Sequence, residues 1–194
     1  ALALSRNAVT VRLLEDIGLS RAASFAQKAG ITSPINEDYT SALGSSVVTP
    51  LGLTSAYATF ASQGIRSEPI LIKSVVDGRG AVLEGYDPQP RESMDRVTAY
   101  LVTSLLKSVV EDGTGRGAKG LNKPLAGKTG TTNNYVDAWF VGFSPSIVTG
   151  VWVGYDNATA SLGDRETGAR SALPIWVGVM ARALEGRPVE EFPV

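Results

Sequence analysis

The chain has 194 residues, of which 43% are hydrophobic and 19% charged, so it can form the core of one folded domain and is not a disordered segment. Its formal net charge is −1 and it has no basic run, which excludes a nucleic-acid-binding surface. Because it has no histidine and no cysteine, it cannot carry a Ser-His-Asp triad, a disulfide or a thiolate metal site, and any nucleophilic chemistry must use Ser or Thr with Lys as the base.

Helices are expected to dominate residues 1–123. Apolar spacing and end signals predict a first helix that stops at Gly18, a second that Ser20 caps and Gly30 ends, and a third that begins with Thr49 and Pro50 and ends before Gly64.

A hairpin is predicted near residues 70–83, where β-branched residues flank the turn sequence DGRG. A long amphipathic helix follows and ends near Gly113, with Leu101, Leu105 and Val109 expected in the core. Residues 114–123 are predicted to form a Gly/Lys-rich loop.

Residues 124–194 are expected to form three strands and a closing helix. The strands carry the sequences GKTG, VDAWFVGF and IVTGVWVGYD, and a polar loop over residues 156–171 leads to the helix LPIWVGVMARALEG. Helices come first and antiparallel strands last, which favours an α+β fold with an antiparallel sheet packed against helices. Residues 1–194 are interpreted as one unit.

The segment Gly127-Lys128-Thr129 allows two interpretations. A phosphate-binding loop needs a glycine five residues before the Gly-Lys pair, and Asn122 stands there instead; the loop must also open a helix, whereas a strand follows here. The alternative is Lys128-Thr129-Gly130, the third signature of serine acyl-transfer enzymes that work without histidine. A turn with a solvated lysine is the simpler structural explanation of the triplet alone.

Each residue of such a strand edge can serve acyl transfer in a specific way. Its lysine and hydroxyls face a substrate carboxylate, Gly130 leaves room for the acyl group, and the backbone N–H of Thr131 points at a developing oxyanion, a donor worth ~3–4 kcal/mol. The segment Ser5-Arg6-Asn7 fits a second signature, Ser-x-Asn, and precedes a predicted helix. Its simpler interpretation is a helix N-cap.

Several segments, taken in order, resemble the C-terminal part of the transpeptidase domain of class A penicillin-binding proteins, the bifunctional cell-wall synthases. They are ALALSRNAVTVRLL, SALGSSVVTPLGLTSAYATFASQG, EDGTGRGAK, AGKTGTTNNYVDAWFVGFSP, GVWVGYD and ETGARSALPIW. The resemblance implies a partial penicillin-binding protein or serine β-lactamase-like fold with a five-stranded antiparallel sheet. It also implies a D,D-transpeptidase that cross-links peptidoglycan stem peptides and is a target of β-lactams.

The resemblance assigns roles to individual residues. Ser5 would relay a proton to the leaving amine, Asn7 would hydrogen-bond the substrate amide, and Lys128 would hydrogen-bond Ser5 and supply positive potential. The hydroxyls of Thr129 and Thr131 would bind the terminal carboxylate of D-Ala-D-Ala.

The remaining assignments concern the rim and the oxyanion. Gly130 would keep the substrate site open, the Thr131 N–H would form half of the oxyanion hole, and Thr132 would lie at the substrate rim. No cofactor and no metal is expected.

The nucleophilic serine of the family's motifs is not found at its expected position in the sequence. The family's Ser-x-x-Lys precedes Ser-x-Asn, whereas the sequence has Ser-x-x-Lys only at Ser104-Leu105-Leu106-Lys107, inside the long helix, where we interpret it as a coincidence. We therefore expect that the chain is a fragment without activity of its own, and that an upstream part of the same protein, or self-association, covers the sheet.

Three further expectations and two alternatives complete the interpretation. The parent protein is expected at the outer face of the bacterial cytoplasmic membrane, in the periplasm, held only by an N-terminal anchor outside these residues. Its expected partners are stem peptides and β-lactam antibiotics, with no nucleic acid. The alternatives are a D,D-carboxypeptidase or β-lactamase-type hydrolase, and a non-catalytic penicillin-sensing or interaction domain.

Overall fold

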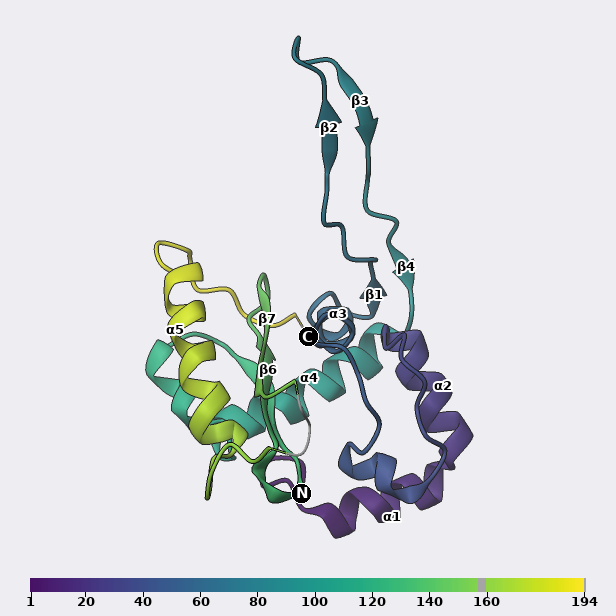
Figure 1. Ribbon diagram of the computed structural model, residues 1–194, viewed down its shortest axis with the longest axis vertical. Helices are drawn as coiled ribbons and strands as arrows, with labels where there is room; N and C mark the ends of the chain where they lie inside the picture. Colours follow the sequence, from purple (N-terminus) through teal and green to yellow (C-terminus); the bar gives the residue numbers. More distant parts are fainter. Residues whose placement is uncertain (157–159, 194) are drawn as a thin grey trace.

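The computed structural model describes residues 1–156 and 160–193 and has the expected α+β architecture. A three-stranded antiparallel sheet stands between α5 on one side and α3 on the other, α1 and α2 lie at the far side of α3, and a narrow β-arm projects from the body (Figure 1).

Five α-helices are described: α1 (Asn7–Ile17), α2 (Leu19–Ala29), α3 (Pro50–Ala61), α4 (Arg96–Glu111) and α5 (Leu173–Ala183). Four short helices join them: η1 (Tyr39–Leu43), η2 (Arg116–Leu121), η3 (Asn133–Tyr135) and the π-helical turn η4 (Gly168–Ala172). The start of α3 is as predicted, because the hydroxyl of Thr49 accepts the Gly52 N–H at 3.1 Å and Pro50 occupies the first turn.

The central sheet has the strand order β5-β6-β7, with β5 (Ala126–Thr131), β6 (Asp137–Phe143) and β7 (Val148–Gly154). Lys128 lies opposite Val141, and Gly130 lies opposite Trp139, which in turn lies opposite Trp152. Because directly opposite residues share a face of the sheet, these side chains all project to one side.

The two faces of the sheet pack against different helices. On the α5 face, Phe140 meets Trp176 edge-on at 4.9 Å between ring centroids, and both side chains are fully buried. On the other face, Phe143 packs with Tyr57 of α3 and Leu106 of α4. The core therefore holds β5 as a rigid edge of the sheet.

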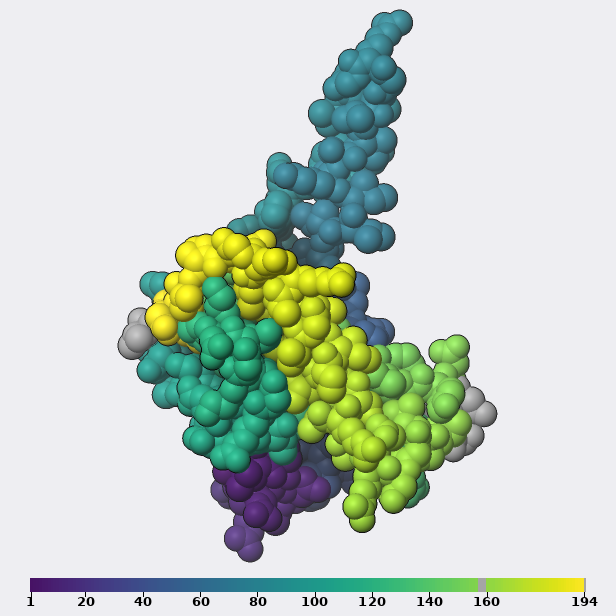
Figure 2. Space-filling view, turned by 90° about the vertical axis from the view of Figure 1, so that its left-hand side faces the viewer, coloured from purple at the N-terminus to yellow at the C-terminus, as the bar shows by residue number. Residues whose placement is uncertain are grey.

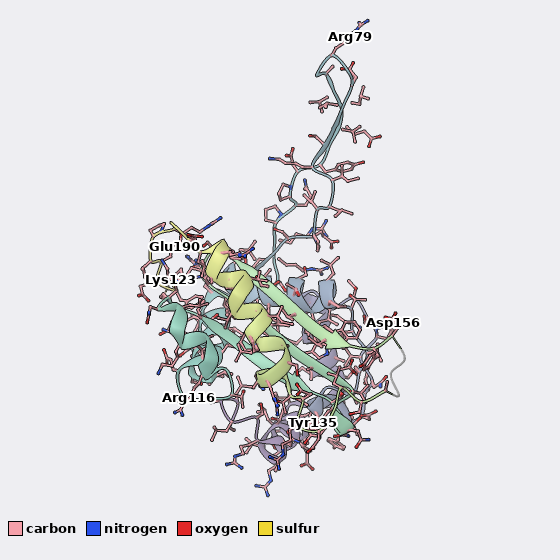
Figure 3. The ribbon with its side chains drawn as sticks, turned by 60° about the vertical axis from the view of Figure 1, so that its left-hand side comes forward. Arg79, Arg116, Lys123, Tyr135, Asp156 and Glu190 are labelled. Carbon is pink, nitrogen blue, oxygen red and sulfur yellow. The ribbon has the colours of Figure 1, made fainter. Side chains whose placement is uncertain are left out.

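The arm consists of two short ladders. At its base β1 (Ile65–Arg66) pairs with β4 (Arg91–Glu92), and beyond it β2 (Ser74–Val76) pairs with β3 (Val82–Gly85), which confirms the predicted hairpin. The space-filling view shows that the arm stands clear of the body (Figure 2), and Arg79 marks its tip (Figure 3).

Three local predictions were wrong. Gly18, rather than Ser20, caps α2, because one glycine serves as the junction of both helices. Residues 116–121 form η2 instead of an irregular loop. In α4, Leu101 and Leu105 are 56% and 54% exposed, and only Val109 of the expected row is buried, because residues four apart drift by ~40° per step around a helix.

One predicted segment is described only in part. Residues 157–159 of the predicted polar loop lie outside the described residues. The helix that follows this loop, α5, buries Leu173, Trp176 and Met180 as its spacing predicts.

Candidate active site

The outer edge of β5 presents backbone groups to the side away from β6. The Thr132 N–H donates to the Asp137 carbonyl at 3.1 Å, which makes residues 132 and 137 a hydrogen-bonded pair. Such pairs alternate along an antiparallel ladder, so residues 130 and 128 also bond to β6, while the N–H and C=O groups of residues 127, 129 and 131 point outwards. The Thr131 N–H therefore points away from β6, as the predicted oxyanion donor requires.

Lys128 lies at the centre of this edge. Its Nζ donates to Ser5 Oγ and, at 2.8 Å, to the outward carbonyl oxygen of Thr129. Burial lowers the pKa of Lys128, because desolvation disfavours the charged form. The edge thus holds a cation with reduced hydration next to the hydroxyl of Ser5.

Ser5 comes to Lys128 from a tight turn that precedes α1. Its backbone has φ 49°, in the left-handed region, and its N–H donates to the Leu2 carbonyl at 3.1 Å. The N-cap of α1 is Arg6, which makes no side-chain cap bond, so the simpler interpretation of Ser-x-Asn as a cap does not hold here. Asn7 is the first residue of α1 and its side chain is exposed.

The turn that carries Ser5 is fixed to the sheet through Thr114, a residue that the sequence reasoning did not single out. The Thr114 N–H donates to the Ala3 carbonyl at 3.1 Å, and the hydroxyls of Thr114 and Thr129 are 2.6 Å apart. Gly113 permits this approach, because a Cβ there would lie 2.1 Å from the Ala3 oxygen. The only signal in the sequence is the GTG triplet of EDGTGRG.

The hydroxyl of Thr129 is therefore already engaged. Either hydroxyl of the Thr114–Thr129 pair can be the donor. If Thr114 donates, Thr129 keeps its hydrogen for a ligand, which is compatible with the predicted carboxylate contact.

The end of β5 is held from the opposite face by η4, a second contact that sequence reasoning missed. The Gly168 N–H donates to Thr131 Oγ1 at 3.0 Å. A Cβ at residue 168 would lie 2.3 Å from the Trp139 carbonyl oxygen and 2.4 Å from that of Gly130, so η4 touches the backbone of both strands. Thr132 accepts the Asp137 N–H on its hydroxyl at 2.8 Å and so closes the turn between β5 and β6.

A cleft of about 850 Å³ opens beside Lys128, between the sheet and the helices α1 and α2. Its walls combine the β5 edge, residues 128–132, with apolar side chains such as Leu13, Leu14 and Tyr57. Ser5 and Asn7 are not among its lining residues, so the cleft is adjacent to the Ser5–Lys128 contact rather than centred on it.

The only Ser-x-x-Lys of the chain lies away from this cleft. Ser104 is exposed on α4 and does not line the cleft, and Lys107 lies 6.0 Å from the ring of Phe192. This placement agrees with its interpretation as a helical coincidence.

A strand edge with a desolvated lysine, hydroxyls and an outward N–H beside a serine on a turn resembles part of the site expected of a serine acyl-transfer enzyme that works without histidine. Residues 1–176 match the family model described as the penicillin binding protein transpeptidase domain. The chain belongs to this family, as a C-terminal part of the transpeptidase domain of the class A type.

Relatives and solved structures agree with this assignment. The chain is 44% identical over 192 residues to penicillin-binding protein 1A of Aquifex aeolicus, covering 99% of the chain and 26% of the relative, and 34% identical over 241 residues to penicillin-binding protein 1A of Pseudomonas aeruginosa, covering 97% and 29%. It therefore spans between a quarter and a third of the length of these curated relatives.

Two solved structures share the fold across nearly the whole chain. The crystal structure of penicillin-binding protein 1A from Haemophilus influenzae has a TM-score of 0.93 at 26% identity and covers 100% of this chain and 35% of its own. The PonA1 protein from Mycobacterium tuberculosis in complex with penicillin V has a TM-score of 0.83 at 28% identity, with 94% and 55% covered.

Proposed function

We propose that this chain is the C-terminal portion of the catalytic domain of a serine D,D-transpeptidase that cross-links peptidoglycan stem peptides. The observation that carries the proposal is the contact of the Lys128 ammonium with the Ser5 hydroxyl at the free edge of β5. Two signatures that are 123 residues apart in the sequence thereby meet at one point.

In the proposed reaction, a serine of an upstream Ser-x-x-Lys attacks the carbonyl between the two D-Ala residues. Ser5 passes a proton to the departing D-Ala amine, and the positive potential of Lys128 lowers the cost of that transfer. The Thr131 N–H stabilises the oxyanion, and Thr129 and Thr131 hold the terminal carboxylate, with Thr132 at the rim. An amine of a neighbouring stem peptide then takes the acyl group.

Asn7 and Gly130 complete the proposed substrate site. Asn7 follows Ser5 by two residues, and its exposed amide is free to hydrogen-bond the substrate amide. Gly130 presents no side chain on the face of the sheet that Lys128 and Trp139 share, so an acyl group can approach the strand closely.

The nucleophile, in this proposal, comes from upstream sequence of the same protein that packs into the cleft beside Lys128. The apolar walls formed by α1, α2 and α3 suit an apolar helix, and the adjoining β5 edge would face the first turn of that helix. Residues 1–194 would then form one domain together with that segment, and alone they would be inactive.

Binding of β-lactams by this chain belongs to the same proposal. It is supported by the complex of the similar PonA1 protein with penicillin V. None of the helices in residues 1–156 and 160–193 combines the length and hydropathy needed to cross a bilayer. We place the active domain at the outer face of the cytoplasmic membrane, anchored through upstream sequence.

The test of the proposed function is a transfer assay with the full-length protein. A stem peptide that ends in D-Ala-D-Ala is incubated with an amine acceptor, and released D-Ala and cross-linked product are measured. We expect cross-linked product that Ser5→Ala and Lys128→Ala suppress. Release of D-Ala without cross-linked product, at every acceptor concentration, would instead indicate a hydrolase.

A further inference from the structure

The β-arm exposes an unusual density of apolar side chains. Eight apolar or aromatic side chains of the arm are exposed to solvent, and Leu71 is 98% accessible: Ile70, Leu71, Ile72, Val75, Val76, Val82, Leu83 and Tyr86. The arm stands clear of the body in two views (Figures 1 and 2). Concentrated apolar surface on a protruding element is typical of an interaction site.

The arm has the form of an incomplete sheet. Within residues 1–156 and 160–193, β2 and β3 pair only with each other. An isolated two-stranded hairpin is marginally stable in water, and further strands usually complete it. Its polar tip, where Asp77 Oδ1 accepts the N–H groups of Arg79 and Ala81 at 2.8 and 2.9 Å, argues against insertion of the arm into an apolar membrane.

The backbone of β2 is ready to accept another strand at two residues. The Tyr86 N–H donates to the Lys73 carbonyl and the Asp77 N–H to the Ala81 carbonyl, both at 2.9 Å. The register shifts between Val75 and Val76, but the extra residue lies on β3, so alternation along β2 is kept and directs the N–H and C=O groups of Ser74 and Val76 away from β3.

The two outer edges of the hairpin differ in charge. Along β3 and the residues after it, Glu84 and Asp87 occur without a lysine or arginine between residues 81 and 90, so two such edges repel each other. Along β2 and its turn, Lys73 and Asp77 are four residues apart with opposite charge. Only the β2 edge is complementary to a copy of itself.

We propose that the β2 edge binds the β2 edge of a second copy of this chain, antiparallel and around a two-fold axis at Val75. In this register Ser74 and Val76 of one copy form hydrogen-bonded pairs with Val76 and Ser74 of the other, which uses the outward backbone groups. Lys73 of each copy then lies directly opposite Asp77 of the other. The two hairpins form one four-stranded sheet, and the pairing is closed by symmetry.

The neighbouring registers are less favourable. Outward groups can meet only when the shift is two residues at a time. The first allowed register towards the base places Lys73 opposite Val75, and the second places Lys73 opposite Lys73. The first allowed register towards the tip places Lys73 opposite Arg79. Like charges directly opposite each other destabilise a sheet, and the register with Lys73 opposite Val75 has no pair of opposite charges, so the Val75-centred register with its two Lys73–Asp77 pairs is favoured.

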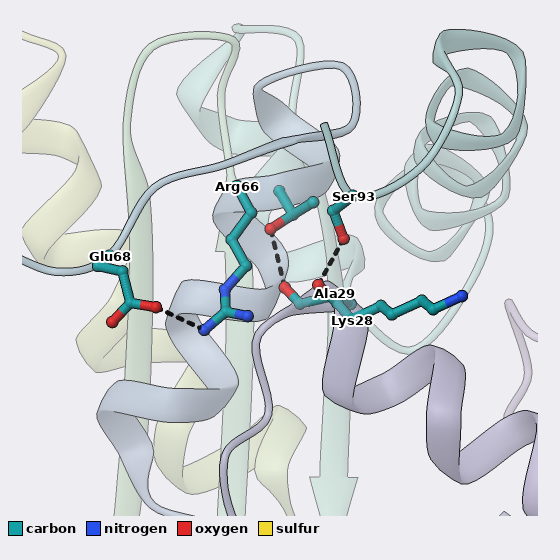
Figure 4. Close-up of polar contacts among 6 residues, drawn as sticks. Lys28, Ala29, Arg66, Glu68 and Ser93 are labelled. Carbon is teal, nitrogen blue, oxygen red and sulfur yellow. Dashed lines mark hydrogen bonds and ion pairs between the residues drawn. The ribbon is translucent and has the colours of Figure 1, made fainter. Parts of the chain in front are cut away.

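The base of the arm is attached to the body at the end of α2. Ser93 Oγ donates to the Lys28 carbonyl at the end of α2, Thr59 Oγ1 donates to the Ala29 carbonyl at 2.8 Å, and Arg66 pairs with Glu68 at 3.0 Å (Figure 4). The Ser93–Lys28 bond ties the end of the arm to α2, the Thr59–Ala29 bond holds α3 against the end of α2, and the Arg66–Glu68 pair lies within the arm itself.

A cysteine cross-link tests the register, since the natural chain has no cysteine. Opposite residues of a non-hydrogen-bonded pair have Cα atoms ~4.5 Å apart, within disulfide range. Val75→Cys should give a disulfide-linked dimer under mild oxidation. The matched control Leu83→Cys, on β3 and 64% exposed, should stay mostly monomeric. Equal cross-linking of both variants, or none in Val75→Cys, would overturn the proposal.

A second experiment does not depend on the disulfide. Sedimentation velocity of the natural chain should show concentration-dependent dimers, which Val75→Lys abolishes by placing two lysines at the axis, whereas Leu83→Lys retains them. Circular dichroism checks that both variants fold. If dimers persist in Val75→Lys, self-association uses another surface, such as the edges of the central sheet, and the proposed pairing is wrong. If the natural chain is monomeric at every concentration, the pairing is also refuted.

Discussion

Replacement of Gly168 by alanine should displace η4 and thereby distort the end of β5. The added Cβ would lie 2.3 Å from the carbonyl oxygen of Trp139 and 2.4 Å from that of Gly130, whereas real Cβ atoms essentially never approach within 3.0 Å. The neighbours are backbone atoms of two paired strands, so no side chain can rotate away. We expect η4 to move outwards and the Gly168–Thr131 hydrogen bond to break.

The size of the effect follows from overpacking. Forced backbone shifts of this kind cost about 2–3 kcal/mol. For a domain of this size the loss corresponds to roughly 4–12 °C in Tm. Thermal unfolding of the chain, followed by circular dichroism, measures it directly.

The matched control is Gly178→Ala in α5. Residue 178 lies inside the helix, and a Cβ there has nothing within 4 Å. Alanine should therefore raise the free energy of unfolding by ~1 kcal/mol through helix propensity. Equal Tm values for Gly168→Ala and the natural chain would refute the reasoning about close approach.

Three further predictions concern single side chains. Lys128→Met removes a desolvated charge together with the two hydrogen bonds of Lys128, so its Tm relative to the natural chain should fall as the pH rises towards the ordinary lysine pKa of 10.5, where the folded-state penalty on the charged lysine disappears. A Tm difference that is independent of pH would contradict this. Asp95→Ala should lower Tm at pH 7, because Asp95 caps α4 and its hydrogen bonds with Thr98 lower its pKa below the ordinary 3.8. The Tm difference from the natural chain should persist above pH 3.8 and fade as the pH falls through the lowered pKa. An equal Tm difference at pH 3 and pH 7 would count against this prediction. Trp152→Phe should cost ~1 kcal/mol in urea unfolding, because it removes the 2.7 Å hydrogen bond from Trp152 Nε1 to Asp137 Oδ1, and an unchanged midpoint would show that this bond contributes nothing.

Local signals explain which elements were predictable. Thr49 and Pro50 define the start of α3, and the DGRG turn defines the hairpin, because each signal acts within a few residues of the chain. The burial of α4 was not predictable from its spacing alone. Its apolar residues surround much of the helix, and only the position of the sheet decides that Leu106 is buried and Leu105 exposed.

The site residues likewise divide into those that local motifs indicate and those that only the fold brings together. Lys128 and Ser5 were found by their motifs, and the structure places them in contact. Thr114 and Gly168 were missed because each acts through a contact between distant segments, with Thr129 and with Thr131. The positive φ of Ser5 was also hidden, since a serine before a helix is equally typical of an N-cap.

The roles of the site residues remain predictions. The structure shows where Asn7, Thr129, Thr131 and Thr132 lie, and their contacts with a substrate carboxylate and amide are part of the proposed function. Substitutions of Thr129 and Thr131 should nevertheless have different structural consequences. Substitution of Thr131 removes the acceptor of the Gly168 N–H, whereas substitution of Thr129 releases Thr114 and, with it, the turn that carries Ser5.

Penicillin acylation measured by intact mass tests the central claim most directly. The 194-residue chain and the full-length protein are incubated with penicillin V under the same conditions, and any adduct is mapped by peptide mass spectrometry. The proposal predicts an adduct only on the full-length protein, at the serine of an upstream Ser-x-x-Lys, with strongly slowed acylation in its Lys128→Ala variant. A stable adduct on the 194-residue chain, at Ser104 or any other serine, would contradict it.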